Sequence, residues 1–198
     1  MTIDDETELL NRLAPVGYYI ALRVGFASPL EEYNLLPASW VKIYTTERLI
    51  LDDPAIRWAY SNEGAARWSA IEDPFGLFVR ARRMGLRHGA VTSVADADGA
   101  RSYGVYVRED REFSDRELVT LEQMIGRLHA AAAPPSNLTQ AEIEVLRMVK
   151  NGYRLKQIAH ALGVTEGAIK QRLKNARTKL GANTATQAAT LAAGFGLI

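Results

Sequence analysis

The sequence predicts an α+β N-terminal domain, in which helices pack on a small antiparallel sheet, followed by an all-α C-terminal domain. Three observations support this division. Apolar residues of the first half alternate with the period of two that is typical of strands. The stretch from Thr139 to Leu180 contains three short helical patterns separated by brief turns. Between the two regions, the segment APPSN cannot continue a helix. We therefore expect a domain at 1–132, a linker at 133–137 and a second domain at 138–198.

Composition narrows the class of protein. The chain has 198 residues, no cysteine and a net charge of +1, but its two parts differ in charge. From Leu138 onward the net charge is about +6, so the remainder carries about −5. No apolar run approaches the roughly 20 residues that span a bilayer, and the acidic N-terminus is unlike a signal peptide. We expect a cytoplasmic protein without a membrane partner, in which a basic module follows an acidic one.

The first elements alternate between helix and strand. Residues 4–13 have the spacing of a short helix, and residues 16–26 alternate as a strand that ends at Phe26. Helical spacing returns over 39–51, where Trp40 and Tyr44 share one face. Asp53 before Pro54 is typical of an N-cap and a first-turn proline.

The sequence of the rest of this domain predicts a third helix, a hairpin and a closing helix. The third helix covers residues 75–84, and strands at 90–95 and 102–107 flank a turn at 95–100. Ser114 and Glu117 have the spacing of a capping box that starts the closing helix. The apolar stripe of that helix either lies on the core or pairs with a second copy of the chain. This stripe consists of Leu118, Leu121, Ile125 and Leu128.

The predicted helices and turns of the C-terminal domain follow one another in the order typical of a helix-turn-helix domain. Thr139 and Glu142 form a second capping box, and the first helix ends before Gly152. A short helix follows and ends at Gly163, and Thr165 caps the third helix. One face of this third helix is apolar and the other carries cations and amides, as a recognition helix in the major groove requires. The alternative is a solvated basic face on a small bundle. The predicted DNA-contacting residues are Lys170, Gln171, Arg172, Lys174, Asn175, Arg177 and Thr178.

The residues of this domain resemble a known family. The segments LTQAEIEVL, QIAHALGVTEGAIKQRL and KLGAN are similar to the C-terminal domain of LuxR-type transcription regulators. The resemblance implies that the face from Lys170 to Thr178 binds double-stranded DNA at an inverted-repeat promoter site. A small-residue helix at 184–193 either packs within its own domain or, as the resemblance favours, contacts a second copy in a homodimer. Its candidate contact residues are Ala185, Ala189 and Ala192.

The N-terminal domain resembles the autoinducer-binding domain of quorum-sensing regulators. The match rests on WVKIYTTERLILDDP, on Trp68 fifteen positions after Asp53, and on GLRHG. A phosphorylated receiver would instead show alternating strands and helices. The resemblance implies an N-acyl homoserine lactone as ligand and no cofactor. Trp40 would then donate to the lactone carbonyl, Asp53 would accept from the amide N–H, and Tyr44 and Trp68 would line the acyl chain and ring.

Two features leave an alternative function open. Leu36 stands where the family commonly has a tyrosine, and the region before Asp4 is short for the family. The alternative is a ligand-independent regulator, or an inhibitor that forms heterodimers with a full-length relative. Catalysis is not expected, because the three histidines are isolated and no metal-ligand spacing or phosphate loop is present.

Overall fold

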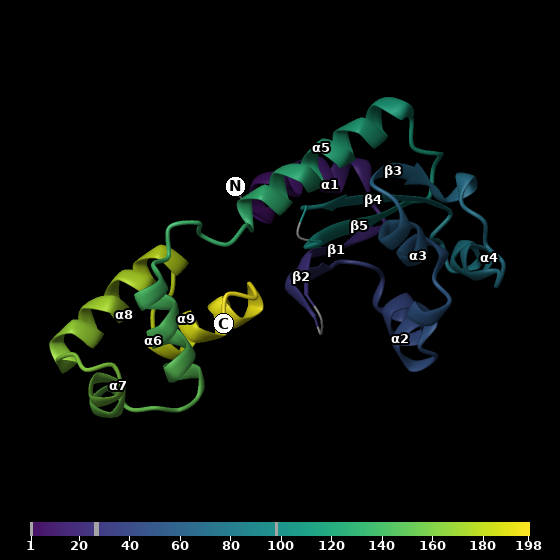
Figure 1. Ribbon diagram of the computed structural model, residues 1–198. Helices are drawn as coiled ribbons and strands as arrows, with labels where there is room; N and C mark the ends of the chain where they lie inside the picture. Colours follow the sequence, from purple (N-terminus) through teal and green to yellow (C-terminus); the bar gives the residue numbers. More distant parts are fainter. Residues whose placement is uncertain (1, 26–27, 98) are drawn as a thin grey trace. The chain divides into compact units, whose positions relative to one another are not determined.

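The structure is a computed structural model that describes residues 2–25, 28–97 and 99–198. The chain divides into two compact units, residues 1–132 and 133–198, so the boundary falls at the start of the predicted linker (Figure 1). Each unit has hydrophobic clusters of its own.

Unit 1 is built on a five-stranded antiparallel sheet with the strand order β2-β1-β5-β4-β3. The strands are β1 (Gly17–Val24), β2 (Pro29–Asn34), β3 (Gly64–Arg67), β4 (His88–Ala95) and β5 (Arg101–Arg108).

The predicted strand end at Phe26 and one residue of the predicted turn at 95–100 lie outside the described residues. The two edge strands, β2 and β3, were not predicted from the sequence. β2 begins with proline and is largely polar, and β3 is a four-residue run of GAAR, so neither shows apolar alternation.

Helices cover both faces of the sheet, which makes unit 1 a three-layer α+β domain (Figure 1). A 3₁₀ turn (Ile3–Glu6), α1 (Thr7–Leu13) and α5 (Asp115–Ala131) cover one face. The other face carries α2 (Ala38–Thr46), α3 (Pro54–Ser61), α4 (Leu77–Arg83) and the 3₁₀ turns η2 (Leu49–Leu51) and η3 (Trp68–Ala70). Strand alternation separates the two cores. On β1, for example, Ile20 belongs to the α5 side and Ala21 to the side of α2, α3 and α4.

The apolar stripe of α5 faces the sheet and not a partner. The four residues predicted as a possible dimer contact are at most 9% exposed and belong to the core under the helix: Leu118, Leu121, Ile125 and Leu128. The dimerisation prediction for these residues is therefore wrong, because a partner could reach them only if α5 left the sheet. The predicted capping box is present, since Ser114 N–H donates to Glu117 Oε2 over 2.8 Å and Glu117 N–H donates to Ser114 Oγ over 3.3 Å.

Unit 2 is all-helical. It contains α6 (Gln140–Lys150), α7 (Leu155–Ala161), α8 (Glu166–Leu180) and α9 (Ala185–Gly194) around a single core. The capping box of Thr139 and Glu142 starts α6. Gly152 lies in the turn after α6 and Gly163 in the turn after α7, and both have the left-handed φ values that favour glycine, 82° and 64°.

The small residues of α9 pack inside unit 2. Ala189 and Ala192 are 2% and 0% exposed in the shared core, and Ala185 is half-buried against it. The prediction that these three alanines contact a second copy is therefore wrong for Ala189 and Ala192, whose methyl groups already fill space within their own domain. Any partner would have to meet the opposite side of α9.

Candidate ligand pocket and DNA-binding surface

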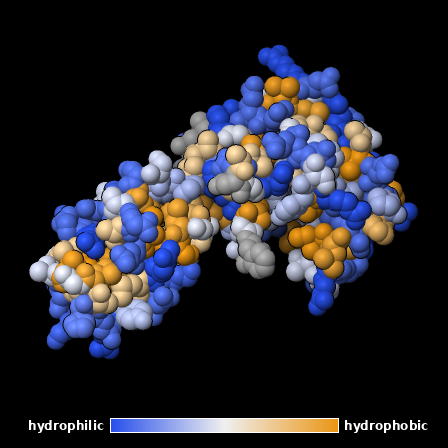
Figure 2. Space-filling view, viewed as in Figure 1, coloured by the Kyte–Doolittle hydropathy of each residue, from blue (hydrophilic) through white to orange (hydrophobic). Residues whose placement is uncertain are grey.

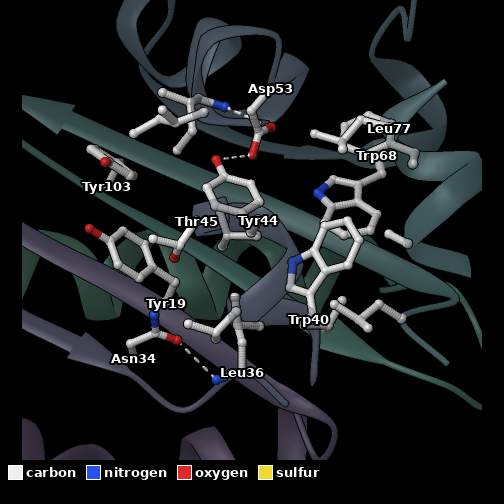
Figure 3. A pocket seen from close by; sticks show the side chains of 18 of the residues that line it. Tyr19, Asn34, Leu36, Trp40, Tyr44, Thr45, Asp53, Trp68, Leu77 and Tyr103 are labelled. Carbon is white, nitrogen blue, oxygen red and sulfur yellow. Dashed lines mark hydrogen bonds between the residues drawn. The ribbon is translucent and has the colours of Figure 1, made fainter. Parts of the chain in front are cut away.

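A cavity of about 200 Å³ lies between helices α2, α3 and α4 and the sheet of unit 1 (Figure 3). All five residues predicted to bind a ligand line it: Leu36, Trp40, Tyr44, Asp53 and Trp68. They come from the loop before α2, from α2 itself, from the start of α3 and from η3. The fold therefore brings together residues that are up to 32 positions apart in the sequence.

Asp53 and Tyr44 form a polar pair at the edge of this cavity. The Tyr44 hydroxyl donates to Asp53 Oδ2 over 2.7 Å. Asp53 Oδ1 accepts the backbone N–H groups of Ala55 and Ile56, so the residue is also the N-cap of α3. Burial raises the pKa of Asp53, against the opposing effect of these hydrogen bonds, and burial followed by the Asp53 charge raises the pKa of Tyr44. Oδ2 keeps acceptor capacity for one more donor.

Two tryptophans place indole N–H groups beside the same space (Figure 3). Trp40 is 4% exposed and Trp68 is 6% exposed. Trp68 Nε1 has no hydrogen-bond partner, and within the described part of the chain it is the only buried side-chain nitrogen or oxygen in that condition. The Trp68 ring stacks on Phe78 of α4, with ring centroids 4.4 Å apart and planes 10° from parallel.

Leu36 lines the cavity through an apolar side chain. Its backbone N–H donates to Asn34 Oδ1 over 3.2 Å, and its side chain packs against the core that contains Trp40. The position therefore supplies no hydroxyl donor to the cavity.

Several lining residues were not predicted from the sequence. Tyr19 and Tyr103, on neighbouring strands, have ring centroids 6.0 Å apart, and burial with the nearby Glu32 charge raises the pKa of Tyr19 to about 12. The alternation of β1 and β5 could have placed both tyrosines on one face, but it could not tell which face is hollow. The remaining unpredicted lining residues are Glu32, Asn34, Val41, Thr45, Ile50, Ile56, Leu77, Phe78, Ala81, Leu86, Val105 and Val107.

Apolar side chains also gather over α2 and the turn that follows it (Figure 2). Ile50 and Leu51 are 53% and 75% exposed there, and Ile50 lines the cavity. At Ile50 the cavity therefore has an exposed apolar wall, a property that suits a ligand with a hydrocarbon portion.

The predicted DNA-contacting residues lie on the outer side of α8. Its inner side, with Ile169, Leu173, Ala176 and Leu180, is buried in the core of unit 2. Five of the seven predicted residues are exposed and two are half-buried. The exposed ones are Lys170, Gln171, Lys174, Asn175 and Thr178, and the half-buried ones are Arg172 and Arg177.

Contacts within unit 2 distinguish the cations of α8 from one another. Lys179 Nζ contacts the buried Glu142 carboxylate at 2.7 Å, and Arg177 Nη1 donates to the carbonyl of Asn183 over 3.2 Å. Although burial alone would raise it, the pKa of Glu142 is lowered by Lys179 and by the hydrogen bonds from Thr139.

On the exposed side of α8, Gln171 donates to Asn175 over 2.8 Å. Lys170 and Lys174 have no ion pair among the described residues, which leaves their charges available to an anionic partner.

The described residues contain neither a cluster that could bind a metal nor a helix that could span a membrane. No group of three or more His, Cys, Asp or Glu side chains could hold a metal ion. No helix there has both the length and the apolar character that crossing a membrane requires.

Comparisons with known proteins agree with the two-unit architecture. Residues 22–133 match the family model of the autoinducer binding domain, and residues 136–192 match that of the bacterial regulatory proteins of the luxR family. The regulatory protein SdiA of Escherichia coli is 27% identical over 98% of this chain and 88% of its own length. The transcriptional activator protein AnoR of Acinetobacter nosocomialis is 26% identical over 83% of this chain and 77% of its own.

The fold has a counterpart among solved structures. A crystal structure of Escherichia coli SdiA matches with a TM-score of 0.53 and 24% identity, over 99% of this chain and 90% of that one. The relatives named here are regulators of transcription and not enzymes. With an autoinducer binding domain over more than half of its length and a luxR-type domain after it, this chain belongs to the LuxR-type quorum-sensing transcription regulators.

Proposed function

We propose that this regulator binds an N-acyl homoserine lactone in the cavity of unit 1 and binds promoter DNA as a homodimer through α8, in the cytoplasm. The observation that carries the ligand proposal is the composition of the cavity. It combines apolar walls with two indole donors, at Trp40 and Trp68, and one carboxylate acceptor at Asp53. Ligand sites are mostly apolar spaces with a few fixed polar groups of this kind.

The chemistry of the ligand fits these groups. An N-acyl homoserine lactone has carbonyl acceptors, one amide N–H and a hydrocarbon tail. Trp40 would donate to the lactone carbonyl, and Asp53 would accept the amide N–H at the remaining capacity of Oδ2. Tyr44 and Trp68 would flank the ring and the start of the chain. The tail would extend along Leu36 toward the exposed apolar wall at Ile50.

Thermal denaturation with a panel of N-acyl homoserine lactones of different chain lengths tests the ligand proposal. A lactone at a hundredfold excess over its Kd stabilises the native state by about 2.7 kcal/mol. Trp40→Phe should reduce this stabilisation, while Trp58→Phe is the matched control because Trp58 does not line the cavity. If no chain length stabilised the protein, the ligand proposal would be wrong.

The DNA proposal depends on the free cations of α8. Lysines that neutralise phosphates release counterions, so each lost contact weakens binding and lowers the salt dependence by about one unit of slope. We expect this result for Lys170→Ala together with Lys174→Ala, measured by fluorescence anisotropy from low to high salt. Lys42→Ala is the control, since it removes an exposed cation from unit 1. Equal salt slopes for the double variant and the control would contradict the assignment of α8.

The homodimer would place two copies of α8 at half-sites about 34 Å apart, one turn of DNA. The dimer contact must use surfaces other than the buried stripe of α5 and the buried alanines of α9. Sedimentation at several protein concentrations, with and without lactone, measures whether the dimer forms. A monomer at every concentration, with DNA or without, would contradict it.

Leu36 favours a second candidate function, because the cavity lacks a hydroxyl at that position. In this alternative, the protein binds DNA without a ligand, or it forms heterodimers with a full-length relative and removes it from DNA. Sequence-specific DNA binding by lactone-free protein would support the first form. Loss of a relative's DNA binding on co-expression would support the second.

A further inference from the structure

Trp68 carries the clearest unmet hydrogen-bonding requirement in the described part of the protein. Its Nε1 is buried and has no partner, whereas the other buried side-chain nitrogens and oxygens described are paired. A buried donor without a partner is costly, so natural proteins seldom keep one unless a ligand, water or function uses it. Figure 3 shows this nitrogen on the side of the ring that faces Tyr44 and the cavity.

The fold holds the Trp68 ring in this orientation from both sides. Phe78 stacks on the ring, with centroids 4.4 Å apart. Gly89 of β4 lies against the ring so closely that a Cβ atom at this position would be 2.1 Å from Cδ2 of Trp68. The ring therefore cannot turn to find another partner for its N–H group without displacing α4 or β4. An N–H group that is both fixed and unpaired is preorganised for a ligand acceptor.

The polar groups of the cavity then correspond to the polar groups of one end of the ligand. Trp40 and Trp68 supply two donors, and Asp53 supplies an acceptor at the edge of the same space. An N-acyl lactone has two carbonyl acceptors with one N–H between them. Trp40 serves the ring carbonyl in the function proposed above, and Leu36 has no donor for the acyl carbonyl. Tyr19, Thr45 and Tyr103 also bring hydroxyl groups to the cavity, but the Trp68 N–H group is the buried donor that has no partner among the described residues.

We propose that Trp68 Nε1 donates the hydrogen bond to the acyl carbonyl of the ligand and thereby replaces the hydroxyl that Leu36 cannot provide. This inference rests on the proposed function and adds a specificity-determining residue to it. The protein then selects ligands whose acyl carbonyl, next to the amide nitrogen, accepts a hydrogen bond. The strength of that acceptor, and not only the length of the tail, sets the affinity.

Nuclear magnetic resonance of the full-length protein observes this hydrogen bond directly. The chain has three tryptophans, so a ¹⁵N-labelled sample gives three indole N–H signals, which Trp→Phe variants assign. N-octanoyl homoserine lactone is the probe. We expect the Trp40 and Trp68 indole protons to move downfield on binding and the Trp58 signal to stay in place. Movement of the Trp40 signal with an unmoved Trp68 signal would overturn the inference while the proposed function stands.

Binding measurements separate a donor from a packing group. Trp68→Phe should weaken the octanoyl lactone about tenfold, the loss of one neutral hydrogen bond. It should weaken the thioamide analogue, whose sulfur is a poor acceptor, by no more than about twofold. Trp58→Phe should change neither affinity. An equal loss for both ligands would make Trp68 a packing residue and overturn the inference. If wild-type protein bound neither probe, the proposed function and this inference would both fail.

Discussion

The geometry of the ligand cavity depends at the residue scale on a glycine that does not contact the cavity. Gly89 belongs to β4, and the Trp68 ring occupies the volume that any larger side chain would need there. Trp68 in turn stacks on Phe78. One small residue thus determines where an aromatic ring lies, and that ring determines where a donor points. Gly89 also closes the GLRHG segment on which the sequence resemblance partly rests, which gives the motif a physical reason.

We expect Gly89→Ala to displace Trp68 and to damage both stability and ligand binding. A Cβ at 2.1 Å and 2.2 Å from two ring atoms forces a shift in a packed core, which typically costs about 1–3 kcal/mol. Urea denaturation followed by tryptophan fluorescence measures the free energy of unfolding, and lactone titration measures the affinity.

Gly126→Ala is the matched control for this variant. Gly126 lies within α5, where an added Cβ meets no atom within 4 Å. Alanine there should stabilise the protein by up to about 1 kcal/mol, because it favours the helix. Equal stability of Gly89→Ala and wild type would contradict the close packing of Gly89 against Trp68.

The sequence predicted part of the candidate site and missed the rest for a definite reason. Trp40, Tyr44, Asp53 and Trp68 were assigned to the site by the resemblance to the autoinducer-binding domain. Helical spacing and an N-cap pattern by themselves place only Trp40 and Tyr44 on one helical face and Asp53 at the start of α3. Tyr19 and Tyr103 enter the cavity through strand pairing between β1 and β5, which depends on contacts more than 80 residues apart in the chain. The unpaired state of Trp68 Nε1 is a property of the packed structure and has no counterpart in a sequence pattern.

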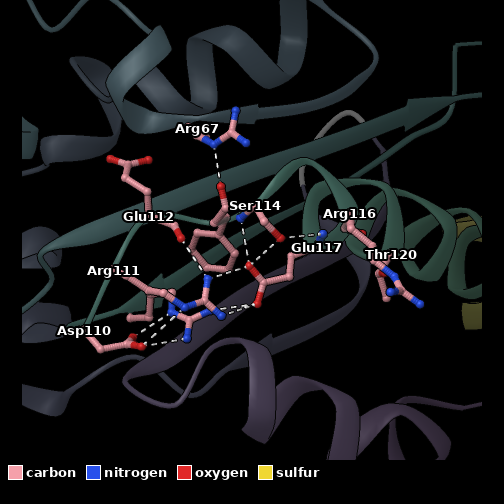
Figure 4. A network of polar contacts seen from close by, with 10 residues as sticks. Arg67, Asp110, Arg111, Glu112, Ser114, Arg116, Glu117 and Thr120 are labelled. Atoms are coloured by element: carbon pink, nitrogen blue, oxygen red, sulfur yellow. Dashed lines mark hydrogen bonds and ion pairs between the residues drawn. The ribbon is translucent and has the colours of Figure 1, made fainter.

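At the scale of elements, α5 is attached to the sheet at both ends. Its N-terminus carries a network of polar contacts around Glu117 (Figure 4). Glu117 Oε1 accepts from Arg108 over 3.0 Å and from Arg111 over 2.8 Å, while Oε2 completes the capping box with Ser114. The Arg108 side chain is 6% exposed, so its charge needs these partners. Arg111 first, and then the Ser114 hydrogen bonds, lower the pKa of Glu117 despite partial burial.

The C-terminal end of α5 is held by a second cluster. His129 Nδ1 lies 2.7 Å from Ser102 Oγ, and His129 Nε2 lies 2.9 Å from Asp96 Oδ1, which pairs with Arg23 through its other oxygen. Ser, His and Asp in this order are also the groups of a hydrolase triad. Ser102 is fully buried, however, and its oxygen accepts the backbone N–H of Arg23, so no substrate can reach it. The cluster is therefore a structural attachment of α5 to β1 and β5, four positions before the first residue of the linker.

Glu117→Gln should destabilise unit 1 in a pH-dependent way. Glutamine keeps the shape of the capping box but removes the charge that pairs with the buried Arg108, at a cost of about 1–3 kcal/mol near pH 7. The folded-state pKa of Glu117 is lowered, so its stabilising contribution is present above the unfolded value of about 4.3 and is lost as the pH falls. Urea denaturation at pH 7 and near pH 3 should show the difference from wild type shrinking in acid.

Glu122→Gln is the control on the same helix, since Glu122 is exposed and forms no ion pair among the described residues. It should change stability little at either pH. A Glu117→Gln deficit that stayed constant with pH would show that the ion pairs contribute nothing and that only shape matters there.

Elements with local signals could be predicted from the sequence, and elements defined by pairing could not. The capping boxes at Ser114 and Thr139 identified the starts of α5 and α6 because cap residues satisfy backbone groups within the same segment. The edge strands β2 and β3 have no such signal. Their backbone groups are satisfied by β1 and β4, and their side chains are polar or small, so only the assembled sheet reveals them.

At the scale of the whole molecule, ligand chemistry and DNA chemistry belong to separate units. Among the described residues, those that line the cavity all belong to unit 1, and the exposed face of α8 belongs to unit 2, which has its own core. Any effect of the ligand on DNA binding must therefore be transmitted from unit 1 to unit 2, within one chain or through association of two chains. We expect the ligand to act by stabilising the homodimer of the proposed function, and this predicts a dependence on the number of half-sites.

The expected result is a ligand effect that appears on a duplex with two half-sites and not on a duplex with one. A single half-site engages one copy of α8, which packs on the core of unit 2, whereas the residues that line the cavity belong to unit 1. Two half-sites are bound by two associated chains, so a ligand that promotes association also promotes binding to this duplex. Saturating lactone should therefore raise the apparent affinity for DNA by about 5- to 150-fold, the usual range of coupling between sites. Anisotropy titrations with both duplexes measure this, and Trp40→Phe should need a higher lactone concentration to reach the same increase. An equal increase on both duplexes would mean that the ligand acts on α8 itself, whereas tight binding unchanged by lactone on either duplex would favour the ligand-independent regulator.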